Sequence, residues 1–240
     1  MNTFKHLRIF GGSTSVPENI VTSKDSFWGL TAQALQIENI VNYSCVGCSL
    51  DSICHIIVSE QHNFDLDADF FLIVIPPLER LTVFDNHKNT KLMASTINTS
   101  DWKLSVSEVM SHHGLMNVPF AEDRTTVIFE DRSWTEVVAM RNLYFLTKWL
   151  DSINVNYLIV NGSKPLDRNN IWLPSDFLLP YCVSHPRIKV FDNTYSSVNI
   201  DVNRPPDFDI FGWFGHHGAA GNQHFFDLGI YPSLKELNLC

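Results

Sequence analysis

The stretch Asp69–Ile75 is the clearest strand in the sequence, and it restricts the fold more than any other feature. It is a near-continuous apolar run that stops at Pro76-Pro77. A strand that is apolar at successive positions is covered on both faces, which is typical of a parallel sheet with helices on either side. Ligands of such open sheets bind at the carboxyl ends of the strands. We therefore expect a functional site at that edge.

Shorter apolar runs predict further strands, and helical patterns lie between them. The predicted strands cover residues 7–10, 39–43, 157–160 and 188–191, and the predicted helices cover 25–35, 51–60 and 131–152. The alternation of strand and helix predicts a doubly wound, three-layer α/β/α sandwich with a mostly parallel sheet. Trp28 could either join the inner side of the first helix or cover a site.

The length of 240 residues predicts a single α/β domain over residues 1–240. Periodicity weakens around residues 82–126, where asparagine and serine suggest loops and only residues 106–110 hint at a helix. We interpret this stretch as an insertion in the domain.

The net charge of −9 argues against nucleic acid or an anionic membrane as a partner. No basic stripe is present that would restore such a role. The sequence shows no secretory signal peptide and no predominantly apolar run of about 18 residues that would span a membrane. These features predict a soluble product made in the cytoplasm, and they leave its oligomeric state open.

Five cysteines are present, and Cys45 and Cys48 form a C-x-x-C pair. A zinc site usually needs a second pair or two histidines at matching spacing, and the sequence has neither. A redox pair normally opens a helix after a buried strand, whereas this pair follows a glycine-containing turn. We interpret the cysteines as buried free thiols and expect neither a metal nor a cofactor.

A candidate nucleophile follows the first predicted strand. Gly11 and Gly12 permit a sharp turn that can leave the hydroxyl of Ser13 exposed at the end of a strand. Nucleophilic catalysis needs that placement, together with nearby backbone N–H groups and a general base. His216 precedes a small-residue turn before a terminal helix, and from there it could reach back across the sheet edge.

Together these segments resemble the SGNH (GDSL-type) hydrolase family, whose phage and environmental variants often read Gly-Cys-Ser-Phe-Thr in the first block. Gly11–Ser15 resembles the block that carries the nucleophile, and Asn42–Ser49 resembles the block with an oxyanion-hole glycine. His216 matches the histidine of the last block, since Gly221 and Asn222 stand where the family has a glycine and a following histidine. The resemblance implies a serine acyl hydrolase, either an esterase or a carbohydrate deacetylase. Its substrate would be a small ester or an acetylated glycan.

Carried over residue by residue, the resemblance makes Ser13 the nucleophile and His216 the base. The N–H groups of Ser13 and Gly47 would form the oxyanion hole, and Gly12, Arg80 and Trp213 would contact the substrate.

The chain departs from the family pattern in three places. Gly12 replaces the aspartate of the first block, and Pro76-Pro77-Leu78-Glu79-Arg80 replaces the block that supplies an asparagine to the oxyanion hole. Trp213 and Phe214 stand where the aspartate that orients the histidine would be. Losing that carboxylate costs a serine protease about four orders of magnitude in rate.

These departures keep two alternatives open. One is a catalytically degenerate SGNH-fold binding or structural protein, for example of a virion, with Trp28, Trp213 and Phe214 stacking on a sugar. The other is a metal-dependent hydrolase built from His216, His217, His224 and Asp227, for which the spacing offers little support.

Overall fold

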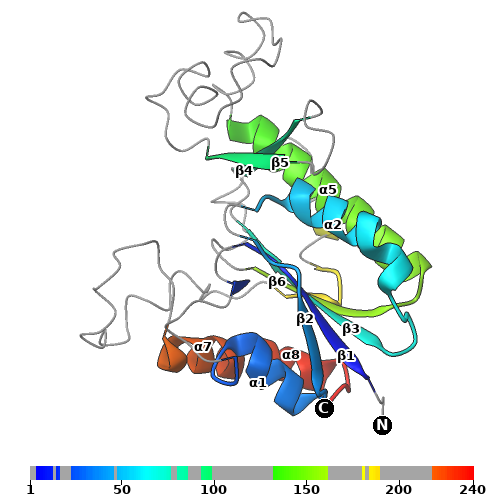
Figure 1. Cartoon of the computed structure of the whole chain (residues 1–240), viewed down its shortest axis with the longest axis vertical. Coiled ribbons are helices and arrows are strands. Elements are labelled where there is room, and N and C mark those ends of the chain that lie inside the picture. Colours follow the sequence, from blue (N-terminus) through cyan, green and yellow to red (C-terminus); the bar gives the residue numbers. More distant parts are fainter. Residues whose placement is uncertain are drawn as a thin grey trace, which may run out of the picture.

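The fold is taken from a computed structural model, which describes residues 4–12, 15–16, 23–45, 48–76, 80–85, 93–98, 132–161, 180–181, 184–189 and 218–240. For residues 80–85, 93–98, 132–137 and 220, only the backbone is described. In this part of the chain, strands and helices alternate in the predicted order (Figure 1).

Five parallel strands form the main sheet, in the order β2-β1-β3-β6-β7. They are β1 (His6–Phe10), β2 (Asn39–Asn42), β3 (Asp69–Ile75), β6 (Asn156–Asn161) and β7 (Ile188–Lys189). The order reverses beside β1, which follows from helices that cross on both faces of the sheet. The sheet is therefore doubly wound, as the sequence predicts.

β3 lies in the middle of the sheet and contributes side chains to both hydrophobic cores. All seven of its residues are buried, and successive side chains point to opposite faces. Phe70, Leu72 and Val74 belong to one core, and Phe71, Ile73 and Ile75 belong to the other. The apolar run therefore supplies both faces of the sheet at once.

Helices cover each of these faces (Figure 1). The first core packs against α1 (Phe27–Ala34), α7 (Ala219–Phe225), the π-helical segment η4 (Phe226–Ile230) and α8 (Tyr231–Glu236). The second core packs against α2 (Leu50–Glu60) and α5 (Arg132–Ser152), and the 3₁₀ turn η2 (Gln61–Asn63) follows α2. The fold class is a three-layer α/β/α sandwich.

Serine side chains begin the two helices that follow β1 and β2. Ser26 accepts a hydrogen bond from the Gly29 N–H at 3.1 Å, and Ser49 accepts one from the Ser52 N–H at 3.3 Å. Such caps satisfy backbone N–H groups that the first turn of a helix leaves unpaired. Trp28 is 5% exposed and packs in the first core, so it does not cover a site.

One part of the predicted insertion differs from expectation. Where the sequence suggested loops, β4 (Arg80–Asp85) and β5 (Met93–Asn98) pair as a separate antiparallel sheet. β4 lies against α2, beyond the main sheet (Figure 1). The helical hint at residues 106–110 lies outside the described residues.

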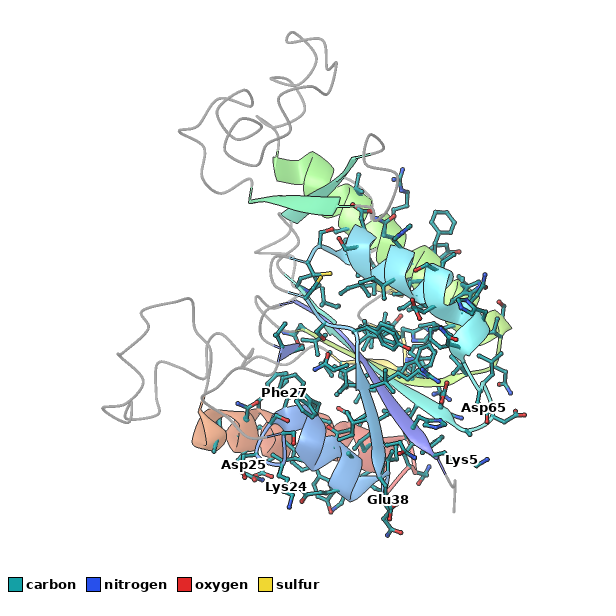
Figure 2. All side chains as sticks on the ribbon, viewed as in Figure 1. Lys5, Lys24, Asp25, Phe27, Glu38 and Asp65 are labelled. Atoms are coloured by element: carbon teal, nitrogen blue, oxygen red, sulfur yellow. The ribbon has the colours of Figure 1, made fainter. Side chains whose placement is uncertain are left out.

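A buried ion pair ties the amino ends of β1 and β3 together. The Asp69 carboxylate accepts from Arg8 Nε and from the Asp65 N–H at 2.8 Å, and it lies 2.9 Å from His6 Nδ1. Arg8 also donates to Tyr43 Oη at 2.9 Å and to the Asn63 carbonyl at 2.7 Å. Figure 2 labels Lys5 and Asp65 at this edge, and Phe27 away from it. We call this edge, where the strands begin, the amino edge.

Among the described helices, none is long and apolar enough to cross a lipid bilayer.

Candidate functional site

The candidate site lies at the carboxyl edge of the sheet, where β1 turns back toward α1. Gly11 follows β1 directly, and the Ser15 N–H donates to the Gly12 carbonyl at 3.0 Å. A Cβ on Gly11 would lie 2.4 Å from Ser15 Oγ and 3.2 Å from Val74 Cβ. The turn is therefore closed so tightly over β3 that only glycine fits at Gly11 without displacing a neighbour.

The chain after β2 is bound to this turn by backbone hydrogen bonds. The Tyr43 N–H donates to the Ile9 carbonyl at 2.8 Å, and the Cys45 N–H donates to the Gly11 carbonyl at 3.2 Å. The pairing of β1 with β2 thus continues past the end of both strands. The two segments that resemble the first and second family blocks lie side by side.

Asn42 strengthens the same junction through its side chain. Its Nδ2 donates to the Ser15 carbonyl at 2.7 Å, and its Oδ1 accepts from the Ser44 N–H at 2.9 Å. The amide therefore fixes the turn after β1 and the turn after β2 relative to each other. The sequence suggested Asn42 only as part of the second block and gave no sign of its partner, which is 27 residues away.

Two hydroxyl oxygens beside Asn42 are buried without a hydrogen-bond partner in the part of the chain described: Ser15 Oγ and Ser44 Oγ. Buried polar atoms usually have partners, so such exceptions need a reason. Ser15 is completely buried, which makes its hydroxyl unsuitable as a nucleophile for an external substrate. Both oxygens nevertheless keep this edge of the sheet polar.

The start of the terminal helices reaches the same edge through Asn222. Its Oδ1 accepts from the Phe27 N–H at 3.0 Å, and its Nδ2 donates to the Gly218 carbonyl at 3.0 Å. The rings of Phe27 and Phe225 pack edge to face with centroids 5.4 Å apart. The helix α1 begins at the carboxyl edge and runs antiparallel to the strands (Figures 1 and 2). Since Asn222 of α7 bonds the first residue of α1, α7 also begins at this edge.

A third asparagine closes β6 at this edge. Asn161 is 1% exposed and stands in register with Ile75, the last residue of β3. It follows the strand predicted at residues 157–160 directly. A polar amide directly after four apolar strand residues was the signal that marks it as a candidate polar group of the site.

The structure describes only two of the predicted site residues, Gly12 and the backbone of Arg80. Gly12 is buried in the turn after β1, and Arg80 begins β4, where only its backbone is described. Ser13, Gly47, Trp213 and His216 lie outside the described residues. Their roles therefore remain predictions, and what the structure shows is how the segments that flank them are arranged.

Two histidine–carboxylate pairs occur in the described part of the chain, away from this site. His6 pairs with Asp69, and His185 Nε2 lies 3.3 Å from an Asp151 oxygen. Asp151 also accepts from Tyr157 Oη at 2.7 Å, and burial, first, and then this bond raise the pKa of Tyr157. Both pairs lie near the amino ends of strands, so neither can serve a nucleophile at the carboxyl edge.

The first turn of α2 adds a carboxylate near the site. Asp51 accepts a hydrogen bond from Asn142 of α5, and burial raises its pKa although this bond and Arg141 oppose the change. Asp51 thus joins α2 to α5. The described residues include no group of three or more His, Cys, Asp or Glu side chains arranged to hold a metal ion.

No protein-family model matches the chain, and neither does any curated protein. Several solved structures are similar along nearly the whole chain. A member of the lipolytic G-D-S-L family from Veillonella parvula is 14% identical over 96% of this chain and 97% of its own, with a TM-score of 0.46. A lipase from a goat rumen metagenome is 13% identical over 95% and 97%, with a TM-score of 0.49.

An acetyl xylan esterase from Geobacillus stearothermophilus is 11% identical over 100% of this chain and 98% of its own, with a TM-score of 0.47. The fold class stated above rests on this chain's own strand order and two cores.

Proposed function

We propose that the chain is an SGNH-like serine acyl hydrolase that cleaves a small ester or removes acetyl groups from a glycan. The observation that supports it best is the convergence of three segments at the carboxyl edge. The turn after β1 is bonded to the chain after β2 through Cys45 and Gly11, and Asn222 fixes the start of α7 beside the start of α1. The three family-like blocks thus leave from one edge of the sheet.

Chain geometry supports the proposed pairing of nucleophile and base. Ser13 follows the buried Gly12 directly, and His216 is two residues from Gly218, whose carbonyl Asn222 holds. Two residues span at most about 7 Å of extended chain. His216 therefore needs only a short connection to Gly218 to approach this edge.

In the proposed reaction, Ser13 Oγ attacks the ester carbonyl while an imidazole nitrogen of His216 takes its proton. The N–H groups of Ser13 and Gly47 stabilise the negative oxygen of the tetrahedral intermediate. Its collapse expels the alcohol, which receives the proton from His216, and leaves an acyl-serine. Water then attacks the acyl-serine through His216, releasing the acid and restoring Ser13.

Gly12, Arg80 and Trp213 complete the proposal as substrate contacts. The small Gly12 would let an acyl group approach the turn, while Arg80 would bind a polar or anionic group. Trp213 would stack on a sugar ring. With Trp213 and Phe214 at the position of the orienting carboxylate, His216 acts without it, so the enzyme should be slow.

The test is pre-steady-state hydrolysis of p-nitrophenyl acetate. We expect a burst of about one p-nitrophenolate per chain followed by turnover on the order of 10⁻³ s⁻¹, roughly four orders of magnitude below an ordinary enzyme. Ser13→Ala should abolish the burst, and Ser15→Ala is the matched control that should keep it. A burst that survives Ser13→Ala would contradict the assignment.

The absent carboxylate favours one alternative, a catalytically degenerate SGNH-fold binding or structural protein, such as a virion component. That function predicts no ester turnover together with measurable binding of a glycan or protein at the same edge. A glycan-array screen of the wild-type chain, run beside the burst assay, separates the two functions.

A further inference from the structure

Cys45 and Cys48 stand on either side of the connection from β2 to α2. Cys48 directly precedes Ser49, the residue that caps α2, and Cys45 is three residues past β2. Cys48 is 2% exposed, as expected for a buried thiol, but Cys45 is exposed. The interpretation of the cysteines as buried thiols was therefore wrong for Cys45 and also for the exposed Cys240. The C-x-x-C pair lies between β2 and the residue that caps α2.

The backbone holds these two residues at a separation that suits a disulfide. The Cys48 N–H donates to the Cys45 carbonyl at 3.3 Å. A bond of this i to i+3 kind brings the two Cα atoms within about 7 Å. Disulfides join residues whose Cα atoms are about 4.4–6.8 Å apart. The Cys48 thiol itself donates to the Ser49 carbonyl at 3.5 Å, close to the start of α2.

The environment of the pair makes Cys45 the more reactive thiol. The hydrogen bond from Cys48 lowers the pKa of Cys45 to about 7, although partial burial opposes this change. Burial, followed by the charge of Asp51, raises the pKa of Cys54 to about 12. Burial also raises the pKa of Cys240.

We propose that Cys45 and Cys48 form a redox-active dithiol that low-molecular-weight disulfides convert into an intramolecular disulfide. The Cys45 thiolate attacks one sulfur of the small disulfide, forms a mixed disulfide and releases one thiolate. Cys48 then loses its proton and attacks Cys45 Sγ, which releases the second thiolate. The two cysteines are oxidised by two electrons, and the small disulfide is reduced to two thiols.

The bridge would form at the edge of the sheet already described. The N–H of Cys45 donates to the Gly11 carbonyl, so the pair is attached to the turn after β1. The proposal concerns only the two thiols, and it holds whether or not the chain hydrolyses esters.

The experiment treats the reduced full-length chain with glutathione disulfide, quenches with acid and alkylates the remaining thiols. Digestion on the amino side of Asp51 separates Cys45 and Cys48 from Cys54 for mass spectrometry. We expect the peptide with Cys45 and Cys48 to lose two hydrogens and take no alkyl group, and dithiothreitol should reverse both changes. Cys54 should remain alkylated.

Variants distinguish the attacking thiol from the resolving thiol. Cys48→Ser should leave a stable glutathione adduct on Cys45, whereas Cys45→Ser should leave Cys48 unmodified. Cys54→Ser is the matched control and should behave as wild type. At pH 7 we expect Cys45 to react roughly severalfold faster than Cys240, because its larger thiolate fraction outweighs the lower nucleophilicity of a low-pKa thiolate.

Full alkylation of both thiols after treatment with excess glutathione disulfide would overturn the proposal. So would a bridge from Cys45 to any cysteine other than Cys48.

Discussion

The buried polar groups at the two edges of the main sheet differ in their hydrogen bonding. At the amino edge, Asp69 is completely buried, and Arg8, His6 and the Asp65 N–H all contact its carboxylate. At the carboxyl edge, Asn42 joins two turns, yet Ser15 Oγ and Ser44 Oγ are buried with no partner among the described residues. Among the described residues, the buried carboxylate at the amino edge is paired, whereas two buried hydroxyl oxygens at the carboxyl edge have no hydrogen-bond partner.

This difference suggests that one edge of the sheet mainly stabilises the fold and that the other is available for a functional site. A paired buried charge holds strands together, and removing one partner exposes the full desolvation cost of the other. A buried hydroxyl that bonds nothing contributes little to stability and can even oppose it. The amino edge should therefore dominate the free energy of unfolding, while the carboxyl edge is where activity should be found.

The largest effect on stability should come from Asp69→Ala. The substitution leaves the Arg8 guanidinium, which is 6% exposed, without its carboxylate. We expect a loss of about 3–5 kcal/mol in the free energy of unfolding, measured by urea denaturation. The exposed Asp67→Ala is the control and should change it by less than about 0.5 kcal/mol. A loss below about 1 kcal/mol for Asp69→Ala would remove the contrast between the edges.

Asn222→Ala should have the next largest effect, because Asn222 links the two ends of the chain. The substitution removes its bonds to the Phe27 N–H and the Gly218 carbonyl, so we expect a loss of about 2 kcal/mol. Asn222→Asp keeps the acceptor for Phe27 and should lose less. The exposed Gln223→Ala is the neighbouring control, and an equal loss there would show that Asn222 has no special role.

The smallest effect should come from Ser15→Ala. Removing an oxygen that forms no hydrogen bond should leave the free energy of unfolding within about 1 kcal/mol of wild type or raise it slightly. The same urea titration measures it. A loss above about 2 kcal/mol would mean that Ser15 Oγ has a partner after all, and the two edges would then be alike.

The sequence predicted the central strands β3 and β6 well because they are buried on both faces. The run from Asp69 to Ile75 is β3 residue for residue, and Ser26 begins α1 as expected. The pairing of β4 with β5 was missed because the asparagine and serine residues around these strands suggest loops, although each strand has three apolar residues. Burial on both faces of a sheet requires a continuous apolar run, whereas the mixed sequences of β4 and β5 give a weaker pattern.

The site was predictable in its parts but not in its connections. The paired glycines predicted the turn after β1. The resemblance to a known family predicted that the chain after β2 lies beside this turn. Asn42 and Asn222 act on backbone atoms far away in the sequence, and no local spacing encodes such partners. The lowered pKa of Cys45 depends on the neighbouring Cys48 side chain, and the spacing of the pair alone did not predict it.

The most direct test of the central claim is covalent labelling by a fluorophosphonate, followed by peptide mapping. If the chain ends meet at the carboxyl edge to activate a hydroxyl, wild type should carry one phosphonate on Ser13, and His216→Ala should slow labelling by about 10²–10⁴-fold. Full labelling at another residue that Ser13→Ala leaves unchanged would contradict the account.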